Sequence, residues 1–174
     1  MNLLWLQSGG CGGCTLSWLG SGHGPLFKVL DEEGIELLWH PSLSEEGVDA
    51  ARALLEDCAA GRMAVDIFCV EGALLRGPHG SGGFHRFAGG AEPMIEWVRR
   101  IAERARHVVA VGSCAAWGGI TAAGVNPTDA CGIQYDGESA GGLFGPEFRD
   151  DSGLPVINVA GCPAHPNTIT KVLA

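Results

Sequence analysis

Short apolar runs alternate with amphipathic segments along most of the chain. Segments with apolar residues at helical spacing lie at 44–61 and 91–105, and a further helix is expected from the turn at residues 11–14 to about Leu30. The runs that suit strands are bounded by glycine, proline or polar residues, and they are residues 3–6, 34–41, 64–72, 107–112 and 154–161. Apolar strands that alternate with helices predict a parallel sheet covered by helices on both faces.

This order of elements predicts an α/β protein with a flavodoxin-like, doubly wound parallel sheet. No internal repeat or linker divides the sequence, so we expect one domain over residues 1–174. Residues 72–90 and 118–153 are rich in glycine and polar side chains, and they are predicted to be long loops. Long ordered loops in a compact domain are usually functional or held by a partner.

Composition excludes several classes of protein. A hydrophobic share of 46% is typical of a globular protein, and a formal charge of -9 offers no electrostatic footprint for nucleic acid. No apolar run approaches the roughly 20 residues needed to span a bilayer. Seven cysteines form an odd set, and Met1 leads directly into a strand without a signal sequence. Together these features predict reduced thiols and a cytoplasmic location.

Four of the cysteines follow predicted strands. Cys11 and Cys14 come after the first strand, Cys114 follows "HVVAVGS", and Cys162 follows "PVINVAG". Because the carboxyl ends of parallel strands share one crevice, we expect these sulfurs to converge there. Four convergent thiolates predict a metal centre at this edge of the sheet.

The spacing of these cysteines favours an iron–sulfur cluster. The C-x2-C pair alone is shared by redox dithiols, zinc sites and clusters, but zinc ribbons usually supply two such pairs. Cys114 and Cys162 are each isolated in the sequence, which suits a cubane iron–sulfur cluster in which each iron binds its own thiolate. Glycines in "GGCGGC", "GSCAAWGG" and "AGCP" let backbone N–H groups approach an anionic cluster. The competing interpretation is that the cysteines are small core residues in tight turns.

The remaining candidate residues give weaker evidence for a role in a functional site. Cys58 and Cys69 lie within a predicted helix and a predicted strand, so we expect them to be core residues. Cys131 lies in a loop, where a structural role is favoured because four ligands are already available. Glu71 ends the third strand and should face the same crevice. Its carboxylate could relay protons, anchor a partner or cap loop amides, and the sequence leaves these roles open.

Four ordered motifs resemble one known family. "WLQSGGCGGCTLS", "CVEGALLRG", "AVGSCAAWGG" and "INVAGCPAHP" resemble the amino-terminal domain of the [NiFe]-hydrogenase small subunit over almost the whole chain. The resemblance implies a flavodoxin-like domain that carries the proximal [4Fe-4S] cluster. It implies that Glu71 lies near a subunit interface and that the Ni–Fe centre, with the catalytic residues, belongs to a partner large subunit. The ligands that it implies are Cys11, Cys14, Cys114 and Cys162.

By this resemblance the chain would be an electron-transfer subunit of an H2:acceptor oxidoreductase. It would form an obligate heterodimer, or a dimer of heterodimers, with the hydrogenase large subunit. Small subunits of the family usually continue into a carboxyl-terminal domain with two further clusters. Because this chain ends at Ala174, we expect that domain to be absent, either by truncation or because this is a naturally short form like those of soluble, multisubunit hydrogenases. The amino terminus, in which no leader is expected, and the motif "SGGCGGCTLS" are most similar to those of the cytoplasmic, H2-sensing regulatory type.

Three other functions remain open. A related cluster-bearing subunit of a quinone-reducing respiratory complex has adjacent first ligands, whereas Gly12 and Gly13 separate Cys11 from Cys14. A zinc-stabilised scaffold without redox activity would use the same four thiols. A flavin-binding domain is disfavoured because the first loop offers cysteines instead of hydroxyl residues for a phosphate.

Overall fold

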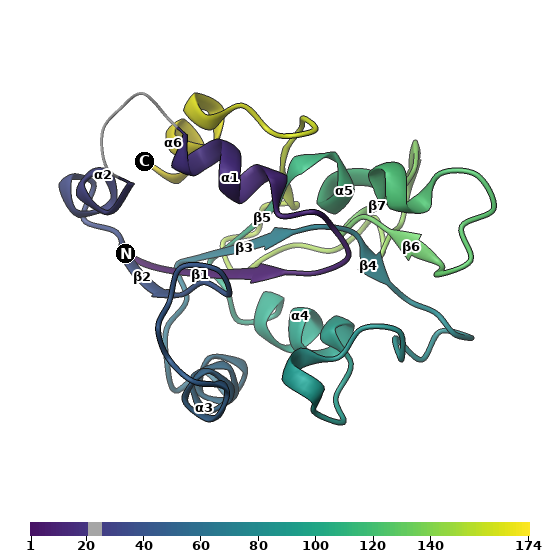
Figure 1. Ribbon diagram of the computed structural model, residues 1–174, viewed down its shortest axis with the longest axis horizontal. Coiled ribbons are helices and arrows are strands. Elements are labelled where there is room, and N and C mark those ends of the chain that lie inside the picture. The colour runs from purple at the N-terminus through teal and green to yellow at the C-terminus, as the bar shows by residue number, and fades with distance from the viewer. Residues whose placement is uncertain (21–25) are drawn as a thin grey trace.

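The computed structural model describes residues 1–20 and 26–174, and its centre is a five-stranded parallel sheet (Figure 1). The strand order is β2-β1-β3-β5-β9. The strands are β1 (Asn2–Gln7), β2 (Glu36–Trp39), β3 (Ile67–Glu71), β5 (His107–Val111) and β9 (Ile157–Val159). Numbered in chain order, these five strands run 2-1-3-4-5, which confirms the predicted flavodoxin-like arrangement.

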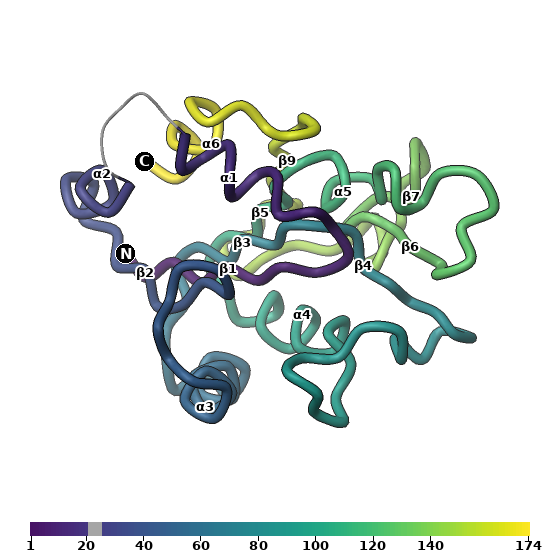
Figure 2. The backbone as a smooth tube through the Cα atoms, in the orientation of Figure 1, coloured from purple at the N-terminus to yellow at the C-terminus, as the bar shows by residue number. Residues whose placement is uncertain are grey.

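Helices cover both faces of the sheet (Figures 1 and 2). One face carries α1 (Gly13–Leu19), α2 (Leu26–Glu32) and α6 (Pro166–Leu173). The other face carries α3 (Val48–Ala59) and α4 (Met94–Ala102). The remaining helix, α5 (Gly112–Trp117), directly follows β5.

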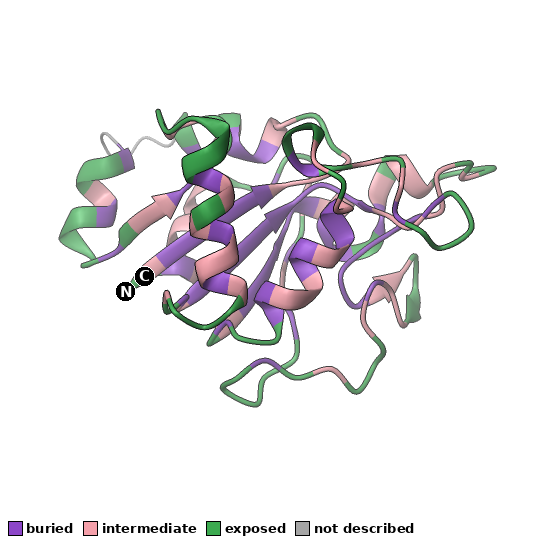
Figure 3. Ribbon diagram, turned by 90° about the horizontal axis from the view of Figure 1, so that it is seen from below, coloured by how far each residue is buried: buried purple, intermediate pink, exposed green. Residues whose placement is uncertain are grey.

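Side-chain alternation in β1, an interior strand between β2 and β3, connects the two halves of the core. Leu3 and Trp5 of β1 pack with the α1, α2 and α6 side chains, whereas Leu4 and Leu6 pack with those of α3 and α4. Successive side chains of a strand point to opposite faces, so the four consecutive apolar residues of β1 serve both layers. Figure 3 shows the buried strands as the middle layer of the molecule.

Two helix predictions differ from the structure. The single helix expected from residues 11–14 to about Leu30 is wrong, because α1 ends at Leu19, where the Gly20 N–H bonds to the Leu16 and Trp18 carbonyls. The part of that prediction at residues 21–25 lies outside the described residues, and α2 begins at Leu26. Helix α6 was not predicted from the sequence, although Pro166 at its start and the helical spacing of Ile169, Val172 and Leu173 are typical of a short amphipathic helix.

The two predicted loops contain short elements that connect them. These are β4 (Leu74–Leu75), η1 (Phe87–Gly89), η2 (Gly119–Ala122), β6 (Ala130–Cys131), β7 (Tyr135–Asp136) and β8 (Ser139–Ala140). Strands β4 and β6 pair antiparallel, so the loop after β3 joins the loop after α5. Arg76 adds ion pairs of 2.7 Å to both Asp129 and Asp136. The glycine-rich segments are therefore ordered against each other beside the sheet.

Within the described residues, no helix combines the length and apolar character that a membrane crossing requires.

We predict that Phe68→Ala lowers the free energy of unfolding by about 3–5 kcal/mol, because it empties a buried aromatic site. Phe68 lies on β3 with an exposed fraction of 0%. Denaturant unfolding followed by circular dichroism measures the change. Phe27→Ala on α2 is the control, since Phe27 is 56% exposed and its loss should cost under about 1 kcal/mol. Equal losses for the two variants would contradict this description of the core.

Candidate metal centre

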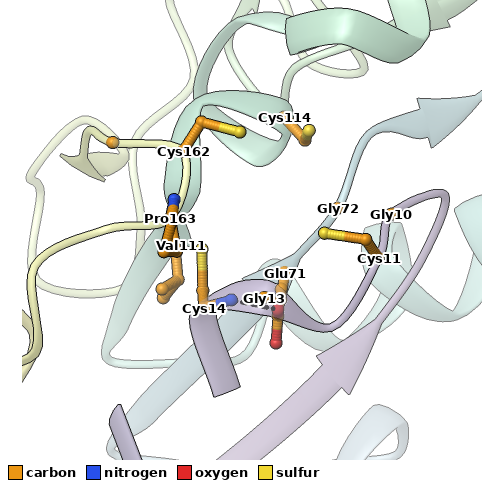
Figure 4. Close-up of a pocket in the computed structure, with 11 residues that line it drawn as sticks. Gly10, Cys11, Gly13, Cys14, Glu71, Gly72, Val111, Cys114, Cys162 and Pro163 are labelled. Atoms are coloured by element: carbon orange, nitrogen blue, oxygen red, sulfur yellow. Dashed lines mark hydrogen bonds between the residues drawn. The ribbon is translucent and has the colours of Figure 1, made fainter. Parts of the chain in front are cut away.

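The four cysteines that follow strands line one cavity at the carboxyl edge of the sheet (Figure 4). Cys11 lies in the turn after β1, and Cys14 lies in the first turn of α1. Cys114 belongs to α5 after β5, and Cys162 follows β9. Figure 4 shows their side chains arranged around a common space. The structure therefore brings together all four sulfurs that the sequence singled out, while their role as ligands stays a prediction.

The cavity has room for a small polyatomic group. Its volume is about 80 Å³, whereas a single water needs roughly 10–15 Å³ of such space. The rest of its lining is mostly backbone and apolar, and comprises Gly10, Gly13, Glu71, Gly72, Val111, Gly161 and Pro163. Among the residues described, no three His, Cys, Asp or Glu side chains are close enough to bind one metal ion. The sulfurs thus surround a space between them instead of meeting at a point.

Two glycines let the backbone approach the sulfurs. Gly112 has a φ of +87°, and a Cβ atom there would lie 2.5 Å from Cys14 Sγ. Gly119 has a φ of +52°, and its Cβ would lie 2.8 Å from Cys114 Sγ. Only glycine combines this left-handed conformation with the absence of a side chain. The positions of Cys14 and Cys114 therefore depend on these glycines.

The thiols are held in a partly desolvated setting. Burial raises the pKa of Cys14, against the opposing effect of the Ala164 N–H, which donates to Cys14 Sγ over 3.4 Å. Burial also raises the pKa of Cys114, while hydrogen bonds from the Ile120 backbone and the Thr121 side chain lower it. Cys11 and Cys162 are exposed. Thiolates at the two deeper positions would gain from a cation in the cavity.

Glu71 reaches the cavity from the end of β3, and its carboxylate caps the cysteine-bearing helix. Glu71 Oε1 accepts the backbone N–H groups of Cys14 and Thr15 at 2.9 and 3.2 Å. Only 4% of the residue is exposed. Of the three roles left open by the sequence, the amide cap is the one seen in the structure. The cap links β3 to the turn that presents Cys11 and Cys14.

Further polar groups, buried except for the partly exposed Gln7, surround Glu71, and none of them was predicted from the sequence. Glu71 Oε2 accepts from Trp5 Nε1, Gln7 Nε2 and Thr15 Oγ1. Thr15 Oγ1 in turn contacts Nε2 of His40, a residue with an exposed fraction of 0%. Burial lowers the pKa of His40 to about 4, although the Glu71 charge acts in the opposite direction. Gln7 and His40 could have been identified from the sequence, because both also lie at the ends of predicted strands.

The other cysteines lie away from the cavity. Cys58, Cys69 and Cys131 are all fully buried among core side chains. Cys131 Sγ donates to the Leu74 carbonyl over 3.7 Å, within the β4–β6 connection. These three positions are structural, as the sequence suggested.

Comparison with known proteins identifies relatives across nearly the whole chain. The family described as NADH ubiquinone oxidoreductase, 20 kDa subunit, matches residues 11–174. The chain is 33% identical to the small subunit of F420 non-reducing hydrogenase II from Methanosarcina mazei, over 98% of this chain and 47% of that protein. It is 31% identical to the hydrogenase-2 small chain of Escherichia coli, over 99% of this chain and 41% of that protein. The chain thus spans less than half the length of these curated relatives.

Solved structures give the same match. The fold superposes on a chain of the actinobacterial-type NiFe-hydrogenase from Ralstonia eutropha with a TM-score of 0.82 and 29% identity, covering 99% of this chain and 51% of that one. A [NiFeSe]-hydrogenase of Dm. baculatum gives a TM-score of 0.79 with 28% identity, covering 99% and 60%. The chain is therefore a homologue of hydrogenase small subunits.

We predict that Gly112→Ala displaces Cys14 and lowers the free energy of unfolding by about 3 kcal/mol, from a left-handed alanine plus an overlap with sulfur. The control is Gly34→Ala, whose φ is +65° but whose Cβ would meet nothing within 4 Å. That change should cost only about 1 kcal/mol. Denaturant unfolding and iron content after reconstitution measure both variants. Full iron binding by Gly112→Ala would show that the close approach to Cys14 is unimportant.

We also predict that His40 makes the protein less stable in acid. The pKa of His40 falls from 6.5 to about 4 on folding, so between these values the unfolded chain binds a proton that the folded chain does not. Stability from this residue is complete above pH 6.5 and declines by about 3 kcal/mol as the pH falls to 4. The measurement is the difference in unfolding free energy between the wild type and His40→Gln at several pH values. Parallel curves for the two proteins would refute the assignment.

Proposed function

The chain belongs to the family of the NADH ubiquinone oxidoreductase 20 kDa subunit, and from this premise we propose that it is the electron-transfer small subunit of a [NiFe]-hydrogenase. In this proposal Cys11, Cys14, Cys114 and Cys162 hold one [4Fe-4S] cluster. The observation that carries it is the placement of these four sulfurs around one cavity at the strand ends. The hydrogenase relatives, matched over 98–99% of the chain, support the same function.

The residues of this chain would hold and insulate the cluster. When bound, the cluster supplies one-electron transfer between the Ni–Fe site of a large subunit and an acceptor. The four thiolates bind iron, and the Ala164 N–H directed at Cys14 Sγ offsets their negative charge. Glycines such as Gly112 keep the backbone close enough to exclude water from the deeper sulfurs. Breaking of the H–H bond is assigned to the partner.

A cluster fits the cavity better than a single zinc ion does. Zinc draws four thiolates to within about 2.3 Å of one point, whereas the cavity keeps the four sulfurs apart around about 80 Å³. In a cubane each iron has its own thiolate, which suits separated sulfurs. The zinc-stabilised scaffold is therefore the weaker alternative.

A subunit of a quinone-reducing respiratory complex is the second candidate, favoured by the description of the matching family. Gly12 and Gly13 between the first two cysteines speak against it. The curated relatives at 31–33% identity, which are hydrogenase subunits, do so as well. An H2-dependent dye reduction by the purified complex would favour the hydrogenase, and a quinone-dependent activity without H2 oxidation would favour the second candidate.

The partner proposed here is a hydrogenase large subunit in a heterodimer. Apolar side chains are exposed at the end of the Cys114 helix and in the segment after it, with Trp117 at 36%, Ile120 at 82% and Val125 at 95%. Permanent interfaces are comparatively apolar and commonly exceed about 2,000 Å². A large subunit seated over this segment would cover these side chains beside the cavity.

A cytoplasmic location and a role in H2 sensing are the finer parts of the proposal. The seven cysteines lack disulfide partners, in keeping with a reducing compartment. Cell fractionation tests the location. Loss of H2-dependent gene expression on deletion of the gene, with H2 consumption unchanged, would support sensing, and the opposite result would indicate an uptake enzyme.

We predict that Cys14→Ser and Cys114→Ser each abolish electron output from the complex while the large subunit is retained, because each removes a cluster ligand. Iron, sulfide and zinc analysis after anaerobic purification, with EPR of the dithionite-reduced protein, measures the cluster. H2-driven dye reduction measures output. Cys58→Ala is the matched control, since Cys58 is buried in α3 away from the cavity, and it should keep the cluster. Wild-type output from a variant that lacks the cluster, or zinc in place of iron and sulfide, would overturn the proposal.

A further inference from the structure

A network of polar groups lies behind the cysteine turn; it is buried at Thr15, His40 and Glu71 and reaches the surface at Ser42. It joins Gln7 at the end of β1, His40 and Ser42 after β2, Thr15 in α1, and Glu71 at the end of β3. We propose that His40 is a positioning residue, which fixes the Thr15 hydroxyl and through it the Glu71 carboxylate that caps the Cys14 helix. The effect on a cluster rests on the proposed function, whereas the positioning itself does not.

The hydrogen-bond partners of the two His40 ring nitrogens determine which nitrogen carries the proton. Its Nδ1 accepts the Ser42 backbone N–H at 3.0 Å, so the ring proton of a neutral imidazole is on Nε2. That Nε2–H points at Thr15 Oγ1 over 3.1 Å. Burial, which lowers the pKa of His40 to about 4, keeps the ring in this neutral form.

Both acceptor sites and the single hydrogen of the Thr15 hydroxyl are then occupied. Its oxygen accepts from His40 Nε2 and from Gln7 Nε2, the latter at 2.9 Å. A hydroxyl has two acceptor sites and one hydrogen, so that hydrogen is directed to Glu71 Oε2. The second amide hydrogen of Gln7 also reaches Glu71 Oε2, at 3.2 Å. The chain of hydrogen bonds from His40 through Thr15 and the second amide hydrogen of Gln7 therefore both end on the Glu71 carboxylate.

This arrangement holds the carboxylate away from the cavity that it borders. Glu71 lines the same space as the cysteines, yet its two oxygens receive five hydrogen bonds from Trp5, Gln7, Cys14 and Thr15. Without the His40 proton donor, the Thr15 oxygen would keep only the Gln7 amide as a donor, so its hydroxyl would be held less firmly toward Glu71. Glu71 would lose a fixed donor, and the amides of Cys14 and Thr15 would lose a fixed acceptor.

Two matched variants test the two ring nitrogens of His40 separately. His40→Gln can place an amide N–H near the Nε2 position, whereas His40→Asn offers an acceptor near the Nδ1 position but no donor toward Thr15. Thr15→Val removes the hydroxyl with little change of shape, and Thr15→Ser keeps it. The double variant His40→Asn/Thr15→Val tests whether His40 acts through Thr15.

Hydrogen exchange of the Cys14 and Thr15 amides is the readout that needs no metal, measured on the full chain as purified. We expect exchange about tenfold faster in His40→Asn and Thr15→Val, the size expected when a hydrogen bond to a charged group is lost. His40→Gln and Thr15→Ser should stay near wild type, and the double variant should match the single ones. Wild-type exchange in His40→Asn, or additive effects in the double variant, would overturn the proposal.

EPR of the dithionite-reduced protein is the second readout. A carboxylate that moves relative to the cavity should shift the cluster signal and its midpoint potential in His40→Asn and Thr15→Val alike, and not in His40→Gln. If the wild type holds no iron–sulfur cluster, the proposed function fails while the exchange result still decides the role of His40. If the cluster is present and its signal is identical in all variants, the positioning has no bearing on the cluster and this part of the proposal is refuted.

Discussion

The interaction on which the cavity depends is the contact between the Glu71 carboxylate and the first turn of α1. A buried carboxylate needs several donors, and the free N–H groups at a helix start need an acceptor, so each satisfies the other. Glu71 belongs to β3, whereas Cys14 and Thr15 follow β1. This one contact therefore fixes the cysteine turn relative to the sheet edge that carries the other two cysteines.

The sheet supplies the rest of the geometry. Strands β1, β3, β5 and β9 are parallel neighbours, so the segments that follow them meet at one edge. Close approach of those segments requires the absence of side chains, and Gly112 meets that requirement beside Cys14. A hydrophobic middle layer makes the edge rigid, since each central strand is buried on both faces.

The residues of the core and the residues of the candidate site lie in different segments of the chain. The strands and the helix faces toward them are apolar, while the connections at the carboxyl edge contain the cysteines, the buried network and the exposed Ile120 and Val125. A protein built this way can keep one fold and place a redox centre between its own core and a partner. The loops joined by Arg76 extend the same edge and add to the area that a partner could cover.

Much of this was determined by the sequence, because periodicity and strand-end cysteines are local patterns with a known place in a parallel sheet. The five strands, the flavodoxin-like order and the convergence of Cys11, Cys14, Cys114 and Cys162 on one edge could all be predicted from it. The break after Leu19 and the role of Glu71 could not be. A helix end depends on small local energies. Thr15 is 25 residues from His40 and 56 residues from Glu71 in the chain, so these contacts exist only once the sheet has brought the strand ends together.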